Sequence, residues 1–238
     1  MSDLHFEHMP DYGRSLFESL DARGADALVL AGDVLSLKLP DLALEAFRKF
    51  VDAYGRVLYV PGNHEFYRTS PRWGAAVLQV IEAELPGFRV LEAGRAVELD
   101  GVRFLGGTMW FPPHRLDRVL RVALNDFAFI EGFTPWVWEQ NRALTDFFER
   151  ELRQGDVVVT HHLPSPRSSP PFFRDTPLEI FFVSDQESLI ERRKPRAWLH
   201  GHTHRACSYR LGETEVRCNP KGYPRERSGG YAPMVVEV

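Results

Sequence analysis

Cysteine and long apolar runs are scarce in this sequence. Only Cys207 and Cys218 occur among 238 residues, too few for a disulfide framework and without zinc-finger spacing. No segment approaches about 18 uncharged apolar residues, and the N-terminus lacks the basic and apolar regions of a signal peptide. We therefore expect neither a disulfide-rich secreted protein nor a membrane protein, but a cytoplasmic one.

A strong charge of either sign is also absent. The formal net charge is −4, so the chain as a whole does not attract nucleic acid or an anionic membrane. Nucleic acid stays a weakly supported partner because Arg115, Arg118 and Arg121 recur at helical spacing. A solvated helix face is the commoner explanation of that spacing.

The order of the apolar segments predicts an α/β fold. Residues 13–24 and 42–55 have helical spacing, whereas 25–33 and 56–65 read as buried strands. A long helix is expected over about 135–153. Further strands are expected within 88–94, 96–108, 156–162, 196–204, 207–211, 214–219 and 234–238.

The length and the 44% hydrophobic content fit one large core. We therefore expect a single domain over residues 1–238, with an aromatic-rich insert at about 110–135 and a site-flanking loop over 163–177. The insert is expected to cover the sheet, and a partial lid over the site is the alternative.

The two cysteines have a predictable relation. If Gly212 and Glu213 form a two-residue hairpin turn, Cys207 and Cys218 face each other on adjacent strands. We expect them to be reduced, because cytosolic thiols stay reduced.

Five short polar segments follow strands or stand where a strand should end. Each alone has an ordinary explanation, since Asp after Ala-Gly is commonly a turn residue and a lone His commonly packs. Together they contain six of the nine histidines, at positions where loops held by a sheet can converge. The segments are SDLH (Asp3, His5), AGDV (Asp33), PGNHE (Asn63, His64, Glu65), VTHH (His161, His162) and GHTH (His202, His204).

The side-chain types in these segments predict divalent metal ions. Imidazole, carboxylate and amide groups without thiolate suit Mn, Fe, Zn, Co or Ni. The candidate ligands exceed the needs of one ion, so two ions sharing one carboxylate are expected to hold a phosphoryl group. The candidates are Asp3, His5, Asp33, Asn63, His161, His202 and His204.

The ordered set Asp-x-His, Gly-Asp, Gly-Asn-His-Glu, His and Gly-His-x-His resembles the calcineurin-like metallophosphoesterases. The likeness runs through essentially the whole chain, and the strings SDLHFE, VPGNHEFY, VTHHLPS, HGHTH and NPKGY resemble a bacterial subgroup. The resemblance implies a mixed β-sandwich flanked by helices and a hydrolase of phosphate esters. It also implies two divalent ions, with manganese favoured.

The resemblance assigns a role to each position. It implies that Asp3, His5 and His204 hold one ion, that Asp33 bridges, and that Asn63, His161 and His202 hold the second. His161 is favoured over His162 as the ligand, and the choice between the two stays open. His64 is implied to contact the phosphate or protonate the leaving oxygen, with Glu65 orienting it. A metal-bound hydroxide would attack phosphorus in line.

The substrate is not encoded in these motifs. Tyr67, Arg205 and the segment from Asn219 to Tyr223 are candidate substrate contacts, each with a packing, solvation or turn explanation beside it. A phosphodiester is slightly favoured over a monoester, and a nucleotide is one candidate. The alternatives are a non-catalytic metal-bound scaffold or regulatory protein that keeps the fold, and a module that binds a single ion.

The first motif departs from the family pattern. In this family Asp-x-His follows a complete first strand, whereas here only Met1 and Ser2 precede Asp3. We expect either that residues upstream are missing, which is favoured, or that another segment takes the place of the strand. A missing strand would loosen the first metal site and leave neighbouring strands with unpaired backbone groups.

Overall fold

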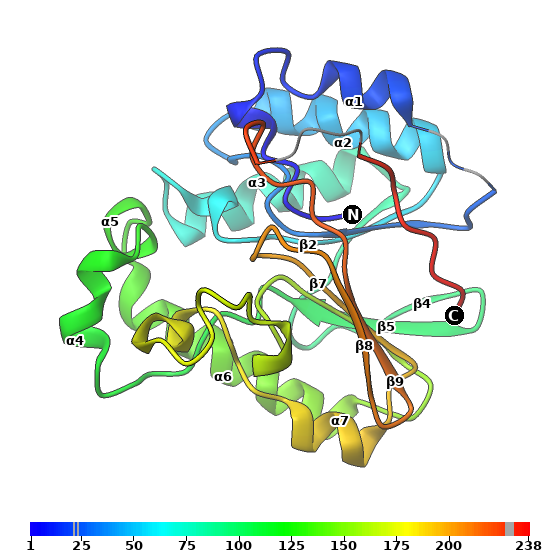
Figure 1. Cartoon of the computed structure of the whole chain (residues 1–238). Helices are drawn as coiled ribbons and strands as arrows, with labels where there is room; N and C mark the ends of the chain where they lie inside the picture. The colour runs from blue at the N-terminus through cyan, green and yellow to red at the C-terminus, as the bar shows by residue number, and fades with distance from the viewer. Residues whose placement is uncertain (21, 23, 227–230) are drawn as a thin grey trace.

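Two β-sheets pack face to face between layers of helices (Figure 1). The computed structural model describes residues 1–20, 22, 24–226 and 231–238. The first sheet is parallel, with the order β1-β2-β3. Its strands are β1 (Leu28–Ala31), β2 (Val57–Val60) and β3 (Phe88–Val90). All four residues of β2 are buried, as expected for a parallel strand covered on both faces.

The second sheet is mixed and has the order β4-β5-β6-β7-β9-β8. The β4–β5 and β8–β9 pairs are antiparallel and the others are parallel. Its strands are β4 (Val97–Leu99), β5 (Val102–Gly107), β6 (Val157–Thr160), β7 (Ala197–His200), β8 (Cys207–Leu211) and β9 (Thr214–Cys218). Leu58 and Val60 of the first sheet share one apolar cluster with Val157 and Val159 of the second, so this cluster is the layer between the sheets.

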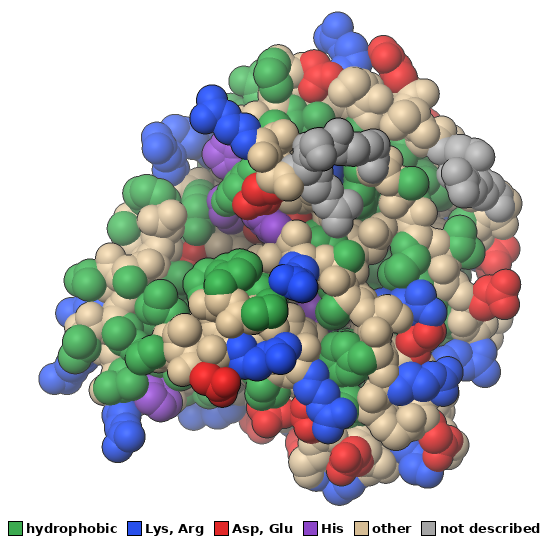
Figure 2. Space-filling view, in the orientation of Figure 1, with side chains coloured by type: hydrophobic (Ala, Val, Ile, Leu, Met, Phe, Trp, Pro, Cys, Tyr) green, Lys and Arg blue, Asp and Glu red, His purple; other side chains and the backbone are tan. Residues whose placement is uncertain are grey.

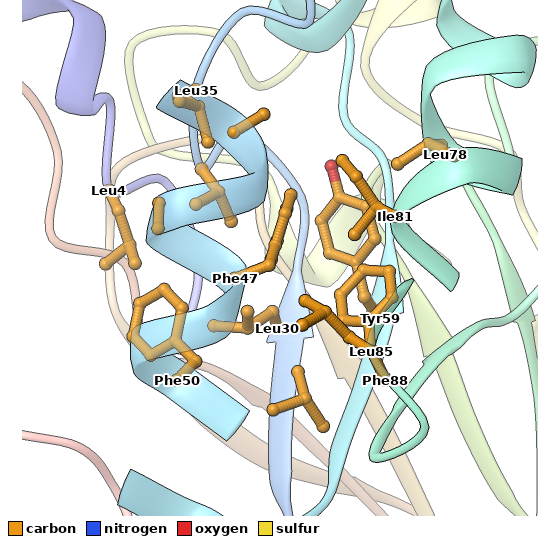
Figure 3. Packing of buried hydrophobic residues seen from close by; sticks show 14 of the residues in the cluster. Leu4, Leu30, Leu35, Phe47, Phe50, Tyr59, Leu78, Ile81, Leu85 and Phe88 are labelled. Atoms are coloured by element: carbon orange, nitrogen blue, oxygen red, sulfur yellow. The ribbon is translucent and has the colours of Figure 1, made fainter. Parts of the chain in front are cut away.

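Helices cover the outer face of the first sheet. These are α1 (Arg14–Ser19), α2 (Pro40–Tyr54) and α3 (Pro71–Glu84). Phe47 and Phe50 of α2 are fully buried against Leu30 and Tyr59 of the strands (Figure 3). Burying each phenyl ring contributes roughly 1.5–3 kcal/mol, so these two residues contribute strongly to the packing of α2 on the sheet.

The outer face of the second sheet is covered by α6 (Phe133–Glu151) and α7 (Glu187–Arg193). Between β5 and α6 lie α4 (Asp117–Leu120), the 3-10 helix η3 (Arg121–Ala123) and α5 (Asp126–Phe129). The remaining 3-10 helices are η1 (Phe6–His8), η2 (His64–Phe66), η4 (Pro166–Ser168) and η5 (Pro177–Phe181). No helix among the described residues is long and apolar enough to cross a membrane.

The predicted α/β sandwich with flanking helices is confirmed. So is the hairpin, because Leu211 pairs with Thr214 and Cys207 with Cys218, and both cysteines are free thiols. The strand predicted at 234–238 is wrong. Its alternation fits a strand, but a strand needs a paired neighbour, and none of the described residues pairs with this segment.

Helix α3 was not predicted from the sequence. Ser70 caps it by accepting a hydrogen bond from the backbone N–H of Trp73, and Pro71 occupies the first helical position. Both features are ordinary helix-start signals. They were available in the sequence and point to the beginning of this helix.

The first three residues are hydrogen bonded on both sides. Toward β1, Ala31 N–H donates to Met1 O at 2.9 Å and Asp3 N–H donates to Gly32 O at 2.9 Å. On the other side, the N–H groups of Lys221 and Gly222 donate to Ser2 O and Asp3 O, each at 2.9 Å. The backbone of Asp3 is therefore fixed between β1 and the segment 219–222. The expectation of upstream residues stays a prediction.

Candidate metal centre

Histidine side chains gather in a hollow on one face of the molecule (Figure 2). Their loops leave the carboxyl ends of parallel strands, which is where open α/β sheets place ligands. Asp33 follows β1, Asn63 follows β2, His161 follows β6 and His202 follows β7. Strands from both sheets thus deliver candidate ligands to one place.

The backbone is strained at many of these positions. Among the seven candidate ligands, five non-glycine residues have positive φ angles between 48° and 79°. They are Asp3, His5, Asp33, His202 and His204. Such conformations are costly and persist only where the surrounding structure imposes them, commonly at functional sites. The clustering is independent of the sequence motifs and points to the same residues.

Four candidate ligands form a first set. Asp3, His5, Asp33 and His204 each present one ligand atom, and these atoms lie within 4.8 Å of one another. The Nε2 atoms of His5 and His204 are 2.8 Å apart. Asp3 Oδ2 is buried and has no hydrogen-bond partner among the described residues. A buried carboxylate oxygen needs a partner, and a cation is a suitable one.

A second set converges on one nitrogen of His161. His161 Nε2 lies 3.1 Å from Asn63 Oδ1, 3.2 Å from His202 Nδ1 and 3.5 Å from Asp33 Oδ1. The other nitrogen, Nδ1, is 2.9 Å from Ala31 O and can donate to it. That contact orients the ring so that Nε2 faces the set, as second-layer contacts of metal-binding histidines do.

Asp33 lies between the two sets. Its Oδ2 atom is 3.6 Å from His5 Nε2, and its Oδ1 atom is 3.5 Å from His161 Nε2. Burial alone would raise the pKa of Asp33, but the positive charges of His161 and His64 outweigh burial and hold it well below its usual range. The carboxylate is therefore ionised and has one oxygen for each set.

The structure separates His161 from His162. His162 Nδ1 lies 3.2 Å from Thr108 O, and its ring stacks on that of His202 at 4.2 Å. Burial and the neighbouring charge of His161 lower the pKa of His162 to about 3. His162 therefore packs beside the second set as a neutral ring, whereas His161 faces Asn63 and Asp33.

His64 lies at the edge of both sets. Its backbone N–H donates to Asp33 Oδ1 at 2.9 Å. Its Nδ1 atom lies 3.4 Å from Glu7 Oε1, and its Nε2 atom is 3.2 Å from the Tyr223 hydroxyl. Burial opposes protonation, but the charges of Asp33 and Glu7 outweigh it and raise the pKa of His64 to about 9.

Glu7 was missed by the sequence reasoning. Besides His64, its Oε1 atom lies 3.5 Å from His5 Nδ1. Burial would raise the pKa of Glu7, but hydrogen bonds to His5 and His64 lower it to about 2. Its place two residues after His5 was the available signal, although a polar residue beside a motif is weak evidence alone.

Glu65 does not have the surroundings expected for a residue that orients His64. It is fully buried and accepts hydrogen bonds from the N–H groups of Asp33, Val34 and Gly62, at 2.7–3.0 Å. The Tyr59 hydroxyl also donates to it at 2.7 Å. Glu65 therefore ties the Asp33 loop to the Gly62 loop, and Glu7 is the carboxylate beside His64.

Asp126, from the insert, is a second residue that the sequence reasoning missed. Its Oδ1 atom accepts from Asn63 Nδ2 at 2.8 Å and from the Tyr67 hydroxyl at 2.7 Å. The first bond turns the Asn63 amide so that Oδ1 faces His161. Asp126 lies about 60 positions from its partners in the sequence, so no local motif marks it.

The three candidate substrate contacts lie in different surroundings. The Tyr67 ring stacks on His64 with centroids 4.2 Å apart, so it borders the site. Arg205 is exposed. The Asn219 side chain donates to Ala232 O at 3.1 Å and holds the C-terminal segment rather than facing the histidines. Nearer the site in the same loop, Glu226 Oε2 lies 2.7 Å from His204 Nδ1.

A comparison with protein families agrees with this arrangement. The calcineurin-like phosphoesterase family matches residues 1–206, a range that includes every candidate ligand. The chain belongs to this family. Enzymes of the family act on phosphate esters and depend on metal ions.

Individual relatives are distant. An uncharacterized protein, L509, of Acanthamoeba polyphaga mimivirus is 24% identical over 265 residues, covering 96% of this chain and 91% of the relative. The phosphopantetheinyl hydrolase of Mycobacterium tuberculosis has a TM-score of 0.74 at 19% identity, covering 95% of this chain and 89% of the other. The protein TT1561 of Thermus thermophilus has a TM-score of 0.59 at 16% identity, covering 92% and 87%. These two structures share the fold.

Proposed function

We propose that this phosphoesterase uses two divalent metal ions, with manganese favoured, and hydrolyses phosphodiesters in preference to monoesters. The position of Asp33 carries the proposal, because its two carboxylate oxygens face different sets of histidines. A carboxylate placed in this way suits two ions that share it. Asp3, His5 and His204 are the proposed remaining ligands of one ion, and Asn63, His161 and His202 those of the other.

The residues present fit such a pair of ions. Two imidazole nitrogens 2.8 Å apart, and a buried carboxylate oxygen that has no hydrogen-bond partner in the described part of the chain, favour a cation between them. The side chains of the two sets are nitrogen and oxygen donors without thiolate, which suits manganese, iron, zinc, nickel or cobalt. When bound, two ions neutralise charge on the phosphoryl oxygens and lower the pKa of water.

His64 is the proposed proton donor to the leaving oxygen. Glu7 Oε1 lies beside Nδ1 of the His64 ring. The proton at Nε2 therefore faces the site, beside the Tyr223 hydroxyl. With a pKa of about 9, His64 is protonated at neutral pH. General acid catalysis of this kind contributes roughly 10²–10⁴-fold to the rate.

The alternative of a non-catalytic scaffold predicts that groups serving only turnover have decayed. In this chain the proposed acid and the carboxylate beside it are both in place, at 3.4 Å. His64 is moreover not needed for either ligand set. These observations favour an enzyme over a scaffold.

The test uses substrates that differ in how much protonation the leaving group needs. Metal-stripped protein is reloaded with Mn²⁺ and assayed on bis-p-nitrophenyl phosphate, p-nitrophenyl phosphate and an alkyl diester. We expect the diester to be preferred, and His64→Ala to lose about 10²–10⁴-fold on the alkyl ester but much less on p-nitrophenyl esters. His114→Ala, which changes an exposed histidine, is the control. Equal losses on all leaving groups would contradict the acid role.

A further inference from the structure

A continuous series of aromatic rings leads from the second ligand set to the solvent. The His202 ring lies 4.9 Å from Phe182, which stacks on Phe173 at 4.4 Å with an interplanar angle of 27°. Phe173 in turn lies 4.6 Å from Phe172. We call Phe172, Phe173 and Phe182 the ring column. Figure 2 shows hydrophobic side chains gathered beside the histidines on this face.

The ring column is fixed relative to the ligands. Leu163, two residues after His161, donates its N–H to Phe182 O at 3.0 Å, and Leu163 pairs with Val183 as in a parallel sheet. Phe173 N–H donates to Pro170 O at 2.9 Å. The inner ring is therefore held against the loop that carries His161, so a group stacked on the column has a defined distance from the ions.

The outer end of the column is open to a ligand. Phe172 is 66% exposed, although burying a phenyl ring would stabilise the folded protein. Single exposed apolar residues are common, but this one ends a series of contacting rings that begins at a proposed metal ligand. Ring faces in this position bind planar groups by stacking, as single-strand-binding proteins do with bases.

The column and the proposed acid contact different parts of the site. Phe182 contacts His202 of the second ligand set, whereas among the described residues the rings that contact His64 are those of His5, His8, Tyr67 and Tyr223. The leaving oxygen has to face His64 to receive a proton. A group on the ring column is therefore on the ester arm that stays attached to phosphorus.

We propose that the ring column binds a planar aromatic group, such as a nucleobase, on the retained arm of a phosphodiester. This proposal rests on the proposed function, because it assumes that the phosphate lies at the metal pair. It names the substrate class as aryl or nucleoside diesters, and it explains a preference over monoesters, which have no retained organic arm.

The test compares two diesters with the same leaving group. Both thymidine 5′-(p-nitrophenyl phosphate) and methyl p-nitrophenyl phosphate release p-nitrophenolate, and only the first has a base on the retained arm. We expect the wild-type protein to prefer the thymidine ester in kcat/KM. Phe172→Leu should lower kcat/KM roughly tenfold for that ester alone, whereas Phe172→Tyr should keep the preference.

The control is Val122→Ala, which changes a residue that is 89% exposed in η3. Melting temperature and bound metal are measured for every variant, to show that fold and centre are intact. Equal losses on both esters, or a Leu variant as selective as the Tyr variant, would overturn the proposal. A metal-loaded wild-type protein that hydrolyses neither ester would instead overturn the proposed function, and this proposal with it.

Discussion

The Nε2 atoms of His5 and His204 lie 2.8 Å apart although 199 positions separate the residues in the sequence. Two neutral imidazoles can form one hydrogen bond at this distance. Asp3 and Asp33 lie beside the same nitrogen atoms, however, and their carboxylates also need a donor or a cation. A cation that binds all four side chains satisfies them together. This relationship joins the first motif of the chain to the last one.

Removing the charge of Glu7 should impair the acid more than the fold. In Glu7→Gln the side chain keeps its size, but His64 loses a carboxylate at 3.4 Å. A hydrogen bond to a charged group contributes about 1.5–3 kcal/mol, so turnover of alkyl esters should fall roughly 10- to 100-fold. Steady-state kinetics with alkyl and p-nitrophenyl esters tests this. Glu18→Gln, at an exposed position in α1, is the control, and an equal effect on both esters would contradict the prediction.

Asp126 should be required for the second ion. Asp126→Ala removes the acceptor that orients the Asn63 amide and the Tyr67 hydroxyl. Loss of an outer contact of this kind commonly costs roughly 10- to 100-fold in metal affinity. Titration with Mn²⁺, followed by isothermal calorimetry, should show one weakened site and one unchanged. Asp146→Ala, in α6 and exposed, should bind as the wild type does. Two unchanged sites would show that Asn63 needs no orientation.

The activity on alkyl esters should depend on pH through His64. Its pKa is raised to about 9, so the protonated form is present below that pH and is lost as the pH rises through it. Bound ions offset the charge of Asp33, so in the metal-loaded protein the pKa of His64 lies below this value. We therefore expect turnover of an alkyl diester to fall as the pH rises toward 9, while turnover of a p-nitrophenyl diester, whose leaving group needs no proton, holds. The pH profiles of kcat for the two esters measure this. The same upper limb for both, or its persistence in His64→Ala, would contradict the assignment.

Metal removal should lower the stability of the fold. A ligand at about 100 times its Kd stabilises the native state by about 2.7 kcal/mol. For a chain of this length that corresponds to a rise of roughly 5–10 °C in Tm. Thermal unfolding of the chelated and the Mn²⁺-reloaded protein is the measurement. The Asp33→Asn protein should show a smaller rise. No rise in the wild type would mean that the ions bind too weakly to matter for folding.

The sequence predicts the sheets well, and it predicts that the candidate ligands follow strand ends, because both depend on local signals. Their role as ligands stays a prediction. Apolar runs that end in Gly-Asp or Pro-Gly-Asn mark strands and the loops after them, and β1 and β2 lie there. The turn at Gly212 and Glu213 fixes a register, and the pairing of Cys207 with Cys218 follows from it.

The residues that orient the site could not be read in the same way. Asp126 reaches Asn63 across 63 positions. The NPKGY string marked Tyr223 as a candidate substrate contact, but not its contact with His64 across 159 positions. Such contacts are products of tertiary packing and leave no periodicity in the sequence. The wrong strand at 234–238 has the same cause, since a strand depends on its neighbour as well as on its own residues. Glu65, inside a motif, proved to hold backbone groups rather than His64.

If Asp33 joins two metal ions, its removal changes both the number of ions that the protein binds and their magnetic coupling. Wild type, Asp33→Asn and the surface variant Asp146→Asn are stripped, reloaded with Mn²⁺ and freed of excess metal, and bound metal is measured by elemental analysis. Electron paramagnetic resonance of the same samples reports spin coupling between neighbouring ions. We predict about two coupled ions per chain in wild type and Asp146→Asn, and loss of the coupling together with at least one ion in Asp33→Asn. One uncoupled ion in the wild type, or two coupled ions retained in Asp33→Asn, would contradict the shared carboxylate.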